Sequence, residues 1–566
     1  MAPKKPIGKR GIRLMLALLG LILMISGLMF LSAASAKMRR KAGRRQLRLM
    51  YGGSGVDENL LAFDPTSSAP AVDKKEHVPG EGAASAVVDE AAGATPSSVD
   101  TLGTAHAPEG GCSLHSRGAD PWPFYKVMKA SRGDVREYPA VGWLGDAKNL
   151  LTLDDARFRS DFRFYIHDDG VFNTSQVEDC YLRKMGIKRD LSNVDWKLPV
   201  FKRMYLAEPA IWPVLRTHAL RTWNPEEASL FVVGFSPFLT EGLTCPGFPS
   251  SSAKYEAEVV KKLSSNKWYQ RKGGFDHMIF FMRFGMKMGA PVKQMLDSGS
   301  LVVTTDRLFW NVVKVLPNIF KSNSVVMAPY VTPYYLDTTP PGEPEMQNKH
   351  NDTWYFFAGT YSRRFGGRGK LAVLAEHLSQ GFVNFTDLRV PKTITPNNGL
   401  LQHSHEIVGQ AVAGIRRSSV CMSPQGDAVT SGRLFEAMAG GCVPVMIAPK
   451  EGAPVELPFP SLIDWDSVAL FTDNFDAISK VKDGINVTGR VMEELVGPKA
   501  SAEAHARLRC MQRQARRVFV KHLSYMQNPL GLTDSILLEV WVLLQKRGLI
   551  QGPFFLDSKT ETPPVS

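Results

Sequence analysis

The chain has 566 residues, of which 44% are hydrophobic and 22% charged; this composition excludes fibrous and wholly disordered proteins and leaves room for two folded domains. The formal net charge of +13 would suit a nucleic-acid-binding protein if the folded part carried it. The first 48 residues, however, hold twelve Lys and Arg and no Asp or Glu, so the rest of the chain has a net charge of only about +1. We therefore expect no nucleic-acid partner.

A membrane span is predicted close to the N-terminus. Residues 1–13 form a short basic tail, and the uncharged run 14–36 is long enough, at ~1.5 Å per helical residue, to cross the ~30 Å hydrocarbon core of a bilayer. We interpret it as a transmembrane signal anchor. A cleaved secretory signal is the alternative, because the run ends in small residues, although signal peptides usually have a shorter apolar region. Basic residues flank the run on both sides, so charge alone leaves the topology open.

A flexible stem and a glycosylated body are expected next. Residues 37–120 comprise the basic flank and then a stretch dominated by Ala, Gly, Ser, Pro, Asp and Glu, which cannot bury enough apolar surface to offset chain entropy. Beyond it lie four N-glycosylation sequons, whose acceptors are Asn173, Asn351, Asn384 and Asn486. These sites favour a type II arrangement in which the body lies in the lumen.

Short apolar runs alternate with stretches long enough for helices, and the alternation occurs twice. The first set, in residues 121–336, contains FRFYIHD, SLFVVGF, FDHMIFFM and SVVMAPY; the second, in residues 350–547, starts at TWYFFAG and ends in helices over 502–547. Such alternation predicts parallel sheets covered on both faces. We expect an α/β protein of two Rossmann-like domains facing a cleft, with a linker at 337–349 and a C-terminal tail at 548–566.

The most informative segment is 418–448, SSVCMSPQGDAVTSGRLFEAMAGGCVPVMIA. It predicts strand, loop, helix and strand, with Thr430 or Ser431 as the N-cap and a pair of glycines ending the helix. In such a unit the helix N-terminus lies at the carboxyl end of the sheet and favours a phosphate. Arg433 could then contact a diphosphate, and Glu436, one turn later, could accept hydrogen bonds from a ribose. A solvated surface ion pair is the alternative.

These residues also carry a family resemblance. The segment from Cys421 to Val445 resembles the C-terminal pattern of exostosin-family glycosyltransferases (family 47), and FRFYIHDDGVFN, FDHMIFF, WYFFAGTYSRRFGGRGKL and LPFPSLIDWDSVAL follow the family's order. The resemblance spans about 163–534. It implies a GT-B fold, a Golgi membrane protein with a lumenal body, a nucleotide-sugar co-substrate such as a UDP-sugar, no other cofactor, no bound metal, and transfer with inversion.

The resemblance also assigns the donor site. It implies a second diphosphate clamp in the 359–368 loop and a pocket lined by the 426–431 turn. The implied donor-binding residues are Arg363, Arg364, Arg368, Gly426, Asp427, Thr430, Ser431, Arg433 and Glu436. For the three loop arginines, a solvated basic turn is the alternative. Gln425 stands where some members carry Arg, and MRFGM follows FDHMIFF where many have a His-Asp pair, which leaves details of diphosphate and acceptor binding open.

The sequence does not single out a general base, and it does not establish whether the cysteines form disulfides. Asp276 and His277 are the leading candidates for the base, followed by Asp168, Asp169 and Glu208, and a structural role is equally open for each. Cys421 and Cys442 lie near equivalent ends of strands expected to be neighbours, so we predict a disulfide between them, with buried thiols as the alternative.

The expected function is therefore an inverting, metal-independent transfer of a sugar from a nucleotide diphosphate to a polysaccharide or glycoprotein glycan. The expected partners are the nucleotide sugar, the glycan acceptor, the membrane through one helix, and related transferases in a homo- or hetero-oligomer. A catalytically inactive subunit that binds glycan or stabilises an active transferase is the alternative. The sugar, the acceptor and the linkage are not predicted.

Overall fold

The computed structural model describes most of the chain between residues 151 and 550. The described residues are 151–194, 203, 205–236, 239–240, 252–282, 295, 298–305, 324–339, 341, 349, 353–359, 368–381, 383–387, 400–424, 431–447, 457–472, 478–479, 481–482 and 484–550. The predicted basic tail, membrane span and stem lie outside them. Within the described part, no helix is both long enough and apolar enough to cross a bilayer.

The N-terminal half, residues 151–339, is built on a parallel sheet of five strands in the sequential order β1-β2-β3-β4-β5. Its strands are β1 (Phe164–His167), β2 (Leu230–Val233), β3 (His277–Phe280), β4 (Leu301–Thr304) and β5 (Val325–Met327). Every residue of β2, β3 and β4 is buried. Continuous apolar runs of this kind are expected where helices cover both faces of a parallel sheet.

The helices of this half connect and cover the strands. They are α3 (Ala156–Asp161), α4 (Thr174–Met185), α6 (Ala207–Thr217), α7 (Ser252–Ser264), α8 (Lys267–Arg271) and α11 (Tyr334–Thr338), with 3₁₀ turns η3 (Gly170–Phe172) and η5 (Pro225–Glu227). Local signals set the ends of α4: the Asn173 side chain accepts a hydrogen bond from the Ser175 N–H, and Gly186 takes the left-handed conformation at φ 63°.

The C-terminal half, residues 353–550, contains a second parallel sheet of five strands, in the order β10-β9-β8-β6-β7. Its strands are β6 (Thr353–Gly359), β7 (Val383–Asp387), β8 (Ser418–Pro424), β9 (Val443–Ile447) and β10 (Leu470–Thr472), and a small hairpin follows from β11 (Val481–Lys482) and β12 (Ile485–Asn486). β8, at the centre of the sheet, is buried throughout. The two parallel sheets confirm the predicted α/β class.

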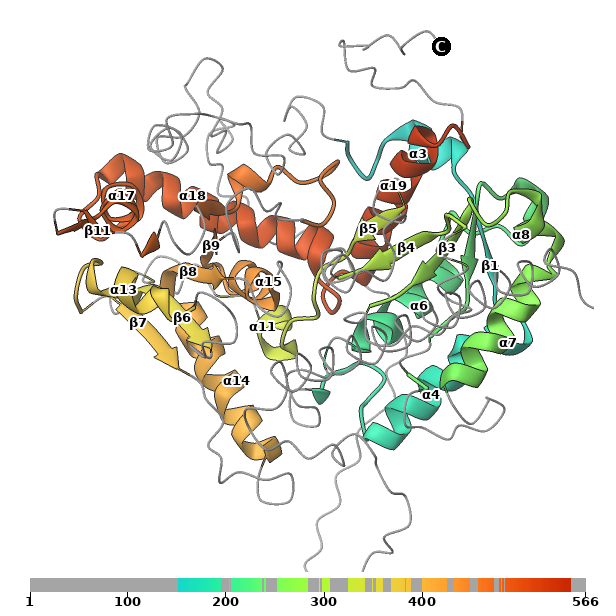
Figure 1. Cartoon of the computed structure of the whole chain (residues 1–566), viewed down its shortest axis with the longest axis horizontal. Helices are drawn as coiled ribbons and strands as arrows, with labels where there is room; N and C mark the ends of the chain where they lie inside the picture. The colour runs from blue at the N-terminus through green and yellow to red at the C-terminus, as the bar shows by residue number, and fades with distance from the viewer. Residues whose placement is uncertain are drawn as a thin grey trace, which may run out of the picture. The chain divides into compact units, whose positions relative to one another are not determined.

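Most helices of this half lie around the second sheet, whereas α19 lies beside β5 of the first sheet (Figure 1). They are α13 (Lys370–Glu376), α14 (Leu400–Arg417), α15 (Gly432–Ala439), α17 (Val487–Val496), α18 (Ala502–Val518) and α19 (Pro529–Lys546), with a 3₁₀ turn η7 (Trp465–Ser467) and a π-helical turn η8 (Phe519–Leu523). Helices α18 and α19 occupy the segment in which closing helices were expected. The boundaries of the two domains stay a prediction.

The C-terminal helix α19 joins the two halves. It packs against α6 and β5 of the N-terminal half, whereas α18, just before it, packs against α15 and α17. The Asp534 carboxylate on α19 lies 3.0 Å from the Arg159 guanidinium and 3.0 Å from the His218 ring. One buried apolar cluster accordingly includes side chains from both halves and from α19.

Candidate functional site

The amino end of α15 lies at the carboxyl edge of the second sheet. The helix follows the buried strand β8, and β8 is flanked on both sides, by β6 and by β9. Ser431 is its N-cap, and the Ser431 Oγ accepts a hydrogen bond from the Arg433 N–H at 3.3 Å. The backbone N–H groups of the first helical turn point towards this edge, and together with the helix dipole they favour an anion.

The Arg433 side chain spans from α15 to the end of β6. Its Nε donates to the Ala358 carbonyl at 2.9 Å and its Nη1 to the Ser431 Oγ at 3.2 Å, while the guanidinium carbon lies 5.4 Å from the centre of the Phe357 ring. A Cβ at Gly359 would meet Arg433 Nη2 and the Phe357 ring, so a side chain there would force the guanidinium to shift. The partly exposed Arg433 therefore sits beside the start of the 359–368 loop.

Glu436 lies one turn further along α15 and is also partly exposed. Its Oε1 is 3.7 Å from Nη2 of Arg203, a buried arginine that precedes α6 in the N-terminal half. The ring of Tyr330, which follows β5, lies 6.1 Å from the ring of Phe435. Residues of the N-terminal half thus contact α15 next to Glu436.

The remaining donor-site predictions are only partly covered by the structure. Arg368 is buried at the start of α13, where its carbonyl accepts a hydrogen bond from the Leu371 N–H at 3.0 Å. The described residues therefore bring Ser431, Arg433 and Glu436 together on one helix end. The other predicted donor residues, Arg363, Arg364, Gly426, Asp427 and Thr430, lie outside the described residues.

A disulfide joins Cys421 of β8 to Cys442, directly before β9, with 5.9 Å between the Cα atoms. This is the pair that the sequence analysis singled out, and the parallel register that sets Cys421 opposite Pro444 brings the two side chains together. The disulfide ties the strand before the predicted phosphate loop to the strand after α15. Cys180 and Cys510 are disulfide-bonded as well.

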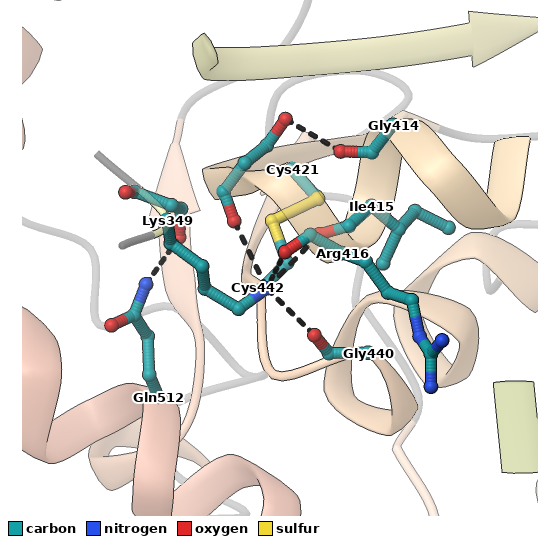
Figure 2. The surroundings of a disulfide bond; sticks show 10 residues. Lys349, Gly414, Ile415, Arg416, Cys421, Gly440, Cys442 and Gln512 are labelled. Atoms are coloured by element: carbon teal, nitrogen blue, oxygen red, sulfur yellow. Dashed lines mark hydrogen bonds between the residues drawn. A yellow bond between two sulfur atoms is a disulfide. The ribbon is translucent and has the colours of Figure 1, made fainter. Parts of the chain in front are cut away.

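A buried lysine beside this disulfide was missed by sequence reasoning. Figure 2 shows the Lys349 ammonium pointing at the backbone carbonyls that end α14 and α15. Its Nζ donates to Arg416 O and Gly440 O at 2.7 Å each, and lies 3.2 Å from Ile415 O and 3.4 Å from Ser418 O. A cation is favoured at helix C-termini, where carbonyls lack intrahelical partners. Lys349 therefore fixes the end of α15 opposite the candidate anion site.

The two leading candidates for the general base lie at the amino end of β3. Asp276 and His277 are fully buried at the amino end of β3. The Asp276 carboxylate lies 2.8 Å from His277 Nδ1 and 2.9 Å from Arg271, and His277 Nε2 lies 3.4 Å from His167 Nε2. Burial lowers the pKa of His277 despite the neighbouring carboxylate. The pair therefore lies in a buried polar cluster of the first sheet, and its assignment as the general base stays a prediction.

The other acidic candidates lie at the carboxyl edge. Asp168 and Asp169 follow β1 directly; Asp168 accepts a hydrogen bond from Arg221 at 2.8 Å, and Asp169 is exposed. Glu208 is buried in the first turn of α6, where burial raises its pKa to about 8, although Ser236, just past β2, and the Met282 backbone, just past β3, favour the ionised form. A carboxyl group whose pKa lies near neutrality is suited to proton transfer.

The sequons differ in their surroundings. Asn384 is exposed on β7, and Asn173 is partly exposed at the start of α4. Asn486, in contrast, is buried, and its Nδ2 donates to the Ile478 carbonyl at 2.7 Å while its Oδ1 accepts from the Gly489 N–H. Because that nitrogen is buried and already donates a hydrogen bond, Asn486 is the least accessible of the three described sequons, and glycosylation of all four stays a prediction. Asn351 lies outside the described residues.

No three His, Cys, Asp or Glu side chains of the described residues gather as metal ligands would. Because the loops next to the candidate site are not among those residues, the expectation of metal-independent chemistry stays a prediction.

Comparison with known proteins places these features in a family. Residues 159–483 match the family model described as the Exostosin GT47 domain. Similar proteins include a "probable glucuronosyltransferase" of Oryza sativa subsp. japonica, 27% identical over 289 residues (48% of this chain, 59% of the relative). In Arabidopsis thaliana they include the "probable glucuronoxylan glucuronosyltransferase IRX7", 29% identical over 348 residues (57% of this chain, 73% of the relative). They also include the "probable beta-1,4-xylosyltransferase IRX10L" of the same species, 26% identical over 294 residues (48% of this chain, 62% of the relative).

The chain thus covers about three fifths of the length of the rice relative. Because the matched segment includes more than half of the chain and contains both sheets and α15, this protein belongs to the Exostosin GT47 domain family.

Proposed function

We propose that this protein is a glycosyltransferase that moves a sugar from a nucleotide diphosphate, with UDP as the expected nucleotide, onto a glycan. Family membership supports this proposal, as do the relatives' names, which describe glucuronosyl- and xylosyltransferases. The observation that carries it is the position of Arg433, whose guanidinium lies where the amino end of α15 meets the carboxyl end of β6.

The donor would bind with its diphosphate at this point. The first-turn N–H groups of α15 and the Arg433 guanidinium would neutralise the charge that develops on the leaving nucleoside diphosphate, and Glu436 would accept hydrogen bonds from the ribose. The predicted arginines of the 359–368 loop would complete the clamp from the side of β6. With cationic side chains in this role, the transfer needs no bound metal.

In the proposed reaction an acceptor hydroxyl oxygen forms a bond to the anomeric carbon while the bond from that carbon to the diphosphate oxygen breaks. The configuration inverts, the bonding pair leaves with the nucleoside diphosphate, and the hydroxyl proton passes to a base. We assign the base to the carboxyl edge of the first sheet, where Glu208 and Asp169 lie. A GT-B arrangement, in which the two sheets face a shared cleft, would bring this edge to the donor.

We propose the Golgi lumen as the location, with a type II anchor at residues 14–36. The Cys421–Cys442 disulfide supports an oxidising compartment, as do the disulfide-bonded Cys180 and Cys510. The exposed sequon at Asn384 is compatible with the same compartment.

A donor screen tests the proposal. The purified protein is incubated with a panel of UDP-sugars, with and without xylan and glycoprotein glycan acceptors, and nucleotide release is measured. We expect release of UDP from one donor, raised by one class of acceptor and lost in Arg433→Ala. A protein that binds no nucleotide would contradict the proposal, whereas one that binds UDP but turns over no donor would point to the inactive-subunit alternative.

A further inference from the structure

Arg203 connects the N-terminal half to the proposed donor helix. Its side chain is 4% exposed and that of Glu436 is 20% exposed, and 3.7 Å separate Arg203 Nη2 from Glu436 Oε1. Arg203 precedes α6 in the chain, so this ion pair joins an element of one half to a helix of the other. A charge pair that is largely removed from solvent is screened less than a surface pair, and its geometry has correspondingly more effect.

The contact involves one oxygen of the Glu436 carboxylate. Arg203 approaches Oε1, which lies on the side of α15 near Gly432 and Tyr330. A guanidinium on this side attracts the carboxylate and restricts its rotation. A carboxylate oxygen accepts hydrogen bonds, and each ribose hydroxyl has an O–H group that donates one.

We propose that Arg203 is a positioning residue for the nucleotide: it holds the Glu436 carboxylate in the orientation in which the carboxylate accepts hydrogen bonds from the ribose hydroxyls of the donor. This inference rests on the proposed function, in which Glu436 contacts the ribose. It adds a residue of the N-terminal half to nucleotide recognition, which couples the binding of the donor to the contact between the two halves.

The test compares the affinities of the purified protein for UDP, 2′-deoxy-UDP and 3′-deoxy-UDP by isothermal titration calorimetry. A hydrogen bond to a charged group corresponds to about tenfold or more in affinity. We therefore expect the wild-type protein to prefer UDP over at least one deoxy analogue by about tenfold. Arg203→Gln should reduce that preference to about threefold or less, and Arg203→Lys, which keeps the charge, should restore part of it.

Two controls separate positioning from folding. Arg159→Gln removes another arginine of the N-terminal half that pairs with a carboxylate of the C-terminal half, Asp534, and it should leave the ribose preference unchanged. Glu436→Gln should abolish the preference by itself, and the double variant with Arg203→Gln should lose nothing further. A general loss of stability would weaken the binding of all three nucleotides equally and leave their ratio unchanged.

The outcomes distinguish this inference from the proposed function. A wild-type ribose preference that is lost in Glu436→Gln but kept in Arg203→Gln would overturn the role of Arg203 and leave the donor site intact. Absence of UDP binding, or of any ribose preference, in the wild-type protein would overturn the assignment of Glu436 and the inference with it.

Discussion

Replacing Lys349 by methionine should destabilise the protein strongly. Methionine keeps most of the side-chain volume but removes the ammonium that Arg416 O and Gly440 O accept at 2.7 Å, and that also lies near Ile415 O and Ser418 O. Lys349 is 1% exposed, so water does not replace the lost donor without rearrangement. No sequence pattern predicts this role, because Lys349 lies in the segment predicted to be a linker.

The magnitude follows from the carbonyls that are left behind. An ammonium group has three donors for four carbonyls, so the two short contacts carry most of the interaction. Each buried carbonyl without a partner costs about 1–3 kcal/mol, and part of this loss is offset because the charge no longer has to be desolvated. We expect the free energy of unfolding to fall by about 3 kcal/mol.

Urea unfolding, followed by circular dichroism, measures this change, with Lys188→Met as the matched control. Lys188 is an exposed lysine of the N-terminal half, and its replacement should leave the unfolding midpoint unchanged. If Lys349→Met unfolds at the wild-type urea concentration, or shifts the midpoint no more than Lys188→Met does, the lysine does not hold the helix ends as described.

Three further predictions concern pH, glycosylation and the donor site. Burial raises the pKa of Glu539 to about 7, above its value of 4.5 in the unfolded chain. The contribution of Glu539 to stability is therefore present at low pH and is lost as the pH rises through 7. Glutamine does not ionise, so the free energy of unfolding of Glu539→Gln, measured with urea, should rise by about 2 kcal/mol relative to that of the wild type between pH 5 and pH 8. In secreted protein, Asn384→Gln should remove a glycan detectable as a gel-mobility shift, whereas Asn486→Gln should leave the mobility unchanged and lower the thermal midpoint. Gly359→Ala should reduce UDP affinity about tenfold in calorimetry with near-wild-type circular dichroism, because the new methyl group displaces the Arg433 guanidinium.

Each of these predictions has an opposing result. A stability difference between Glu539→Gln and wild type that does not vary with pH would show that Glu539 has an ordinary pKa in the folded protein. A mobility shift in Asn486→Gln would show that the buried asparagine carries a glycan. If Gly359→Ala binds UDP with wild-type affinity, the Arg433 guanidinium does not contact the nucleotide.

Local patterns in the sequence predicted the parallel sheets and the segment around α15. The βα alternation gives the strands because buried parallel strands need continuous apolar runs, and the helix after SVCMSP follows from its N-cap and its terminal glycines. The Cys421–Cys442 disulfide could be predicted for the same reason, because strand order and register place both residues at neighbouring positions.

Contacts between segments far apart in the chain could not be predicted from the sequence. The acidic residue within FDHMIFF suggested a base, and parallel topology places Asp276 at the amino end of β3, whereas loops usually build sites at the carboxyl edge of a parallel sheet. Arg203 and Lys349 have no sequence signature, because their partners, Glu436 and the helix-terminal carbonyls, are brought to them only by packing. The burial of Asn486 follows from the contact of β12 with the Ile478 turn, which a sequon pattern does not register.

The most direct test of the account is the binding of UDP to the amino end of α15, measured by isothermal titration calorimetry on wild-type protein, Arg433→Ala and Arg417→Ala. Arg417 is an exposed arginine at the last turn of α14 and serves as a charge-matched control. We predict that Arg433→Ala weakens UDP binding by about tenfold or more, while Arg417→Ala binds as wild type does. Equal affinities of the three proteins would contradict the placement of the diphosphate, and with it the proposed donor site.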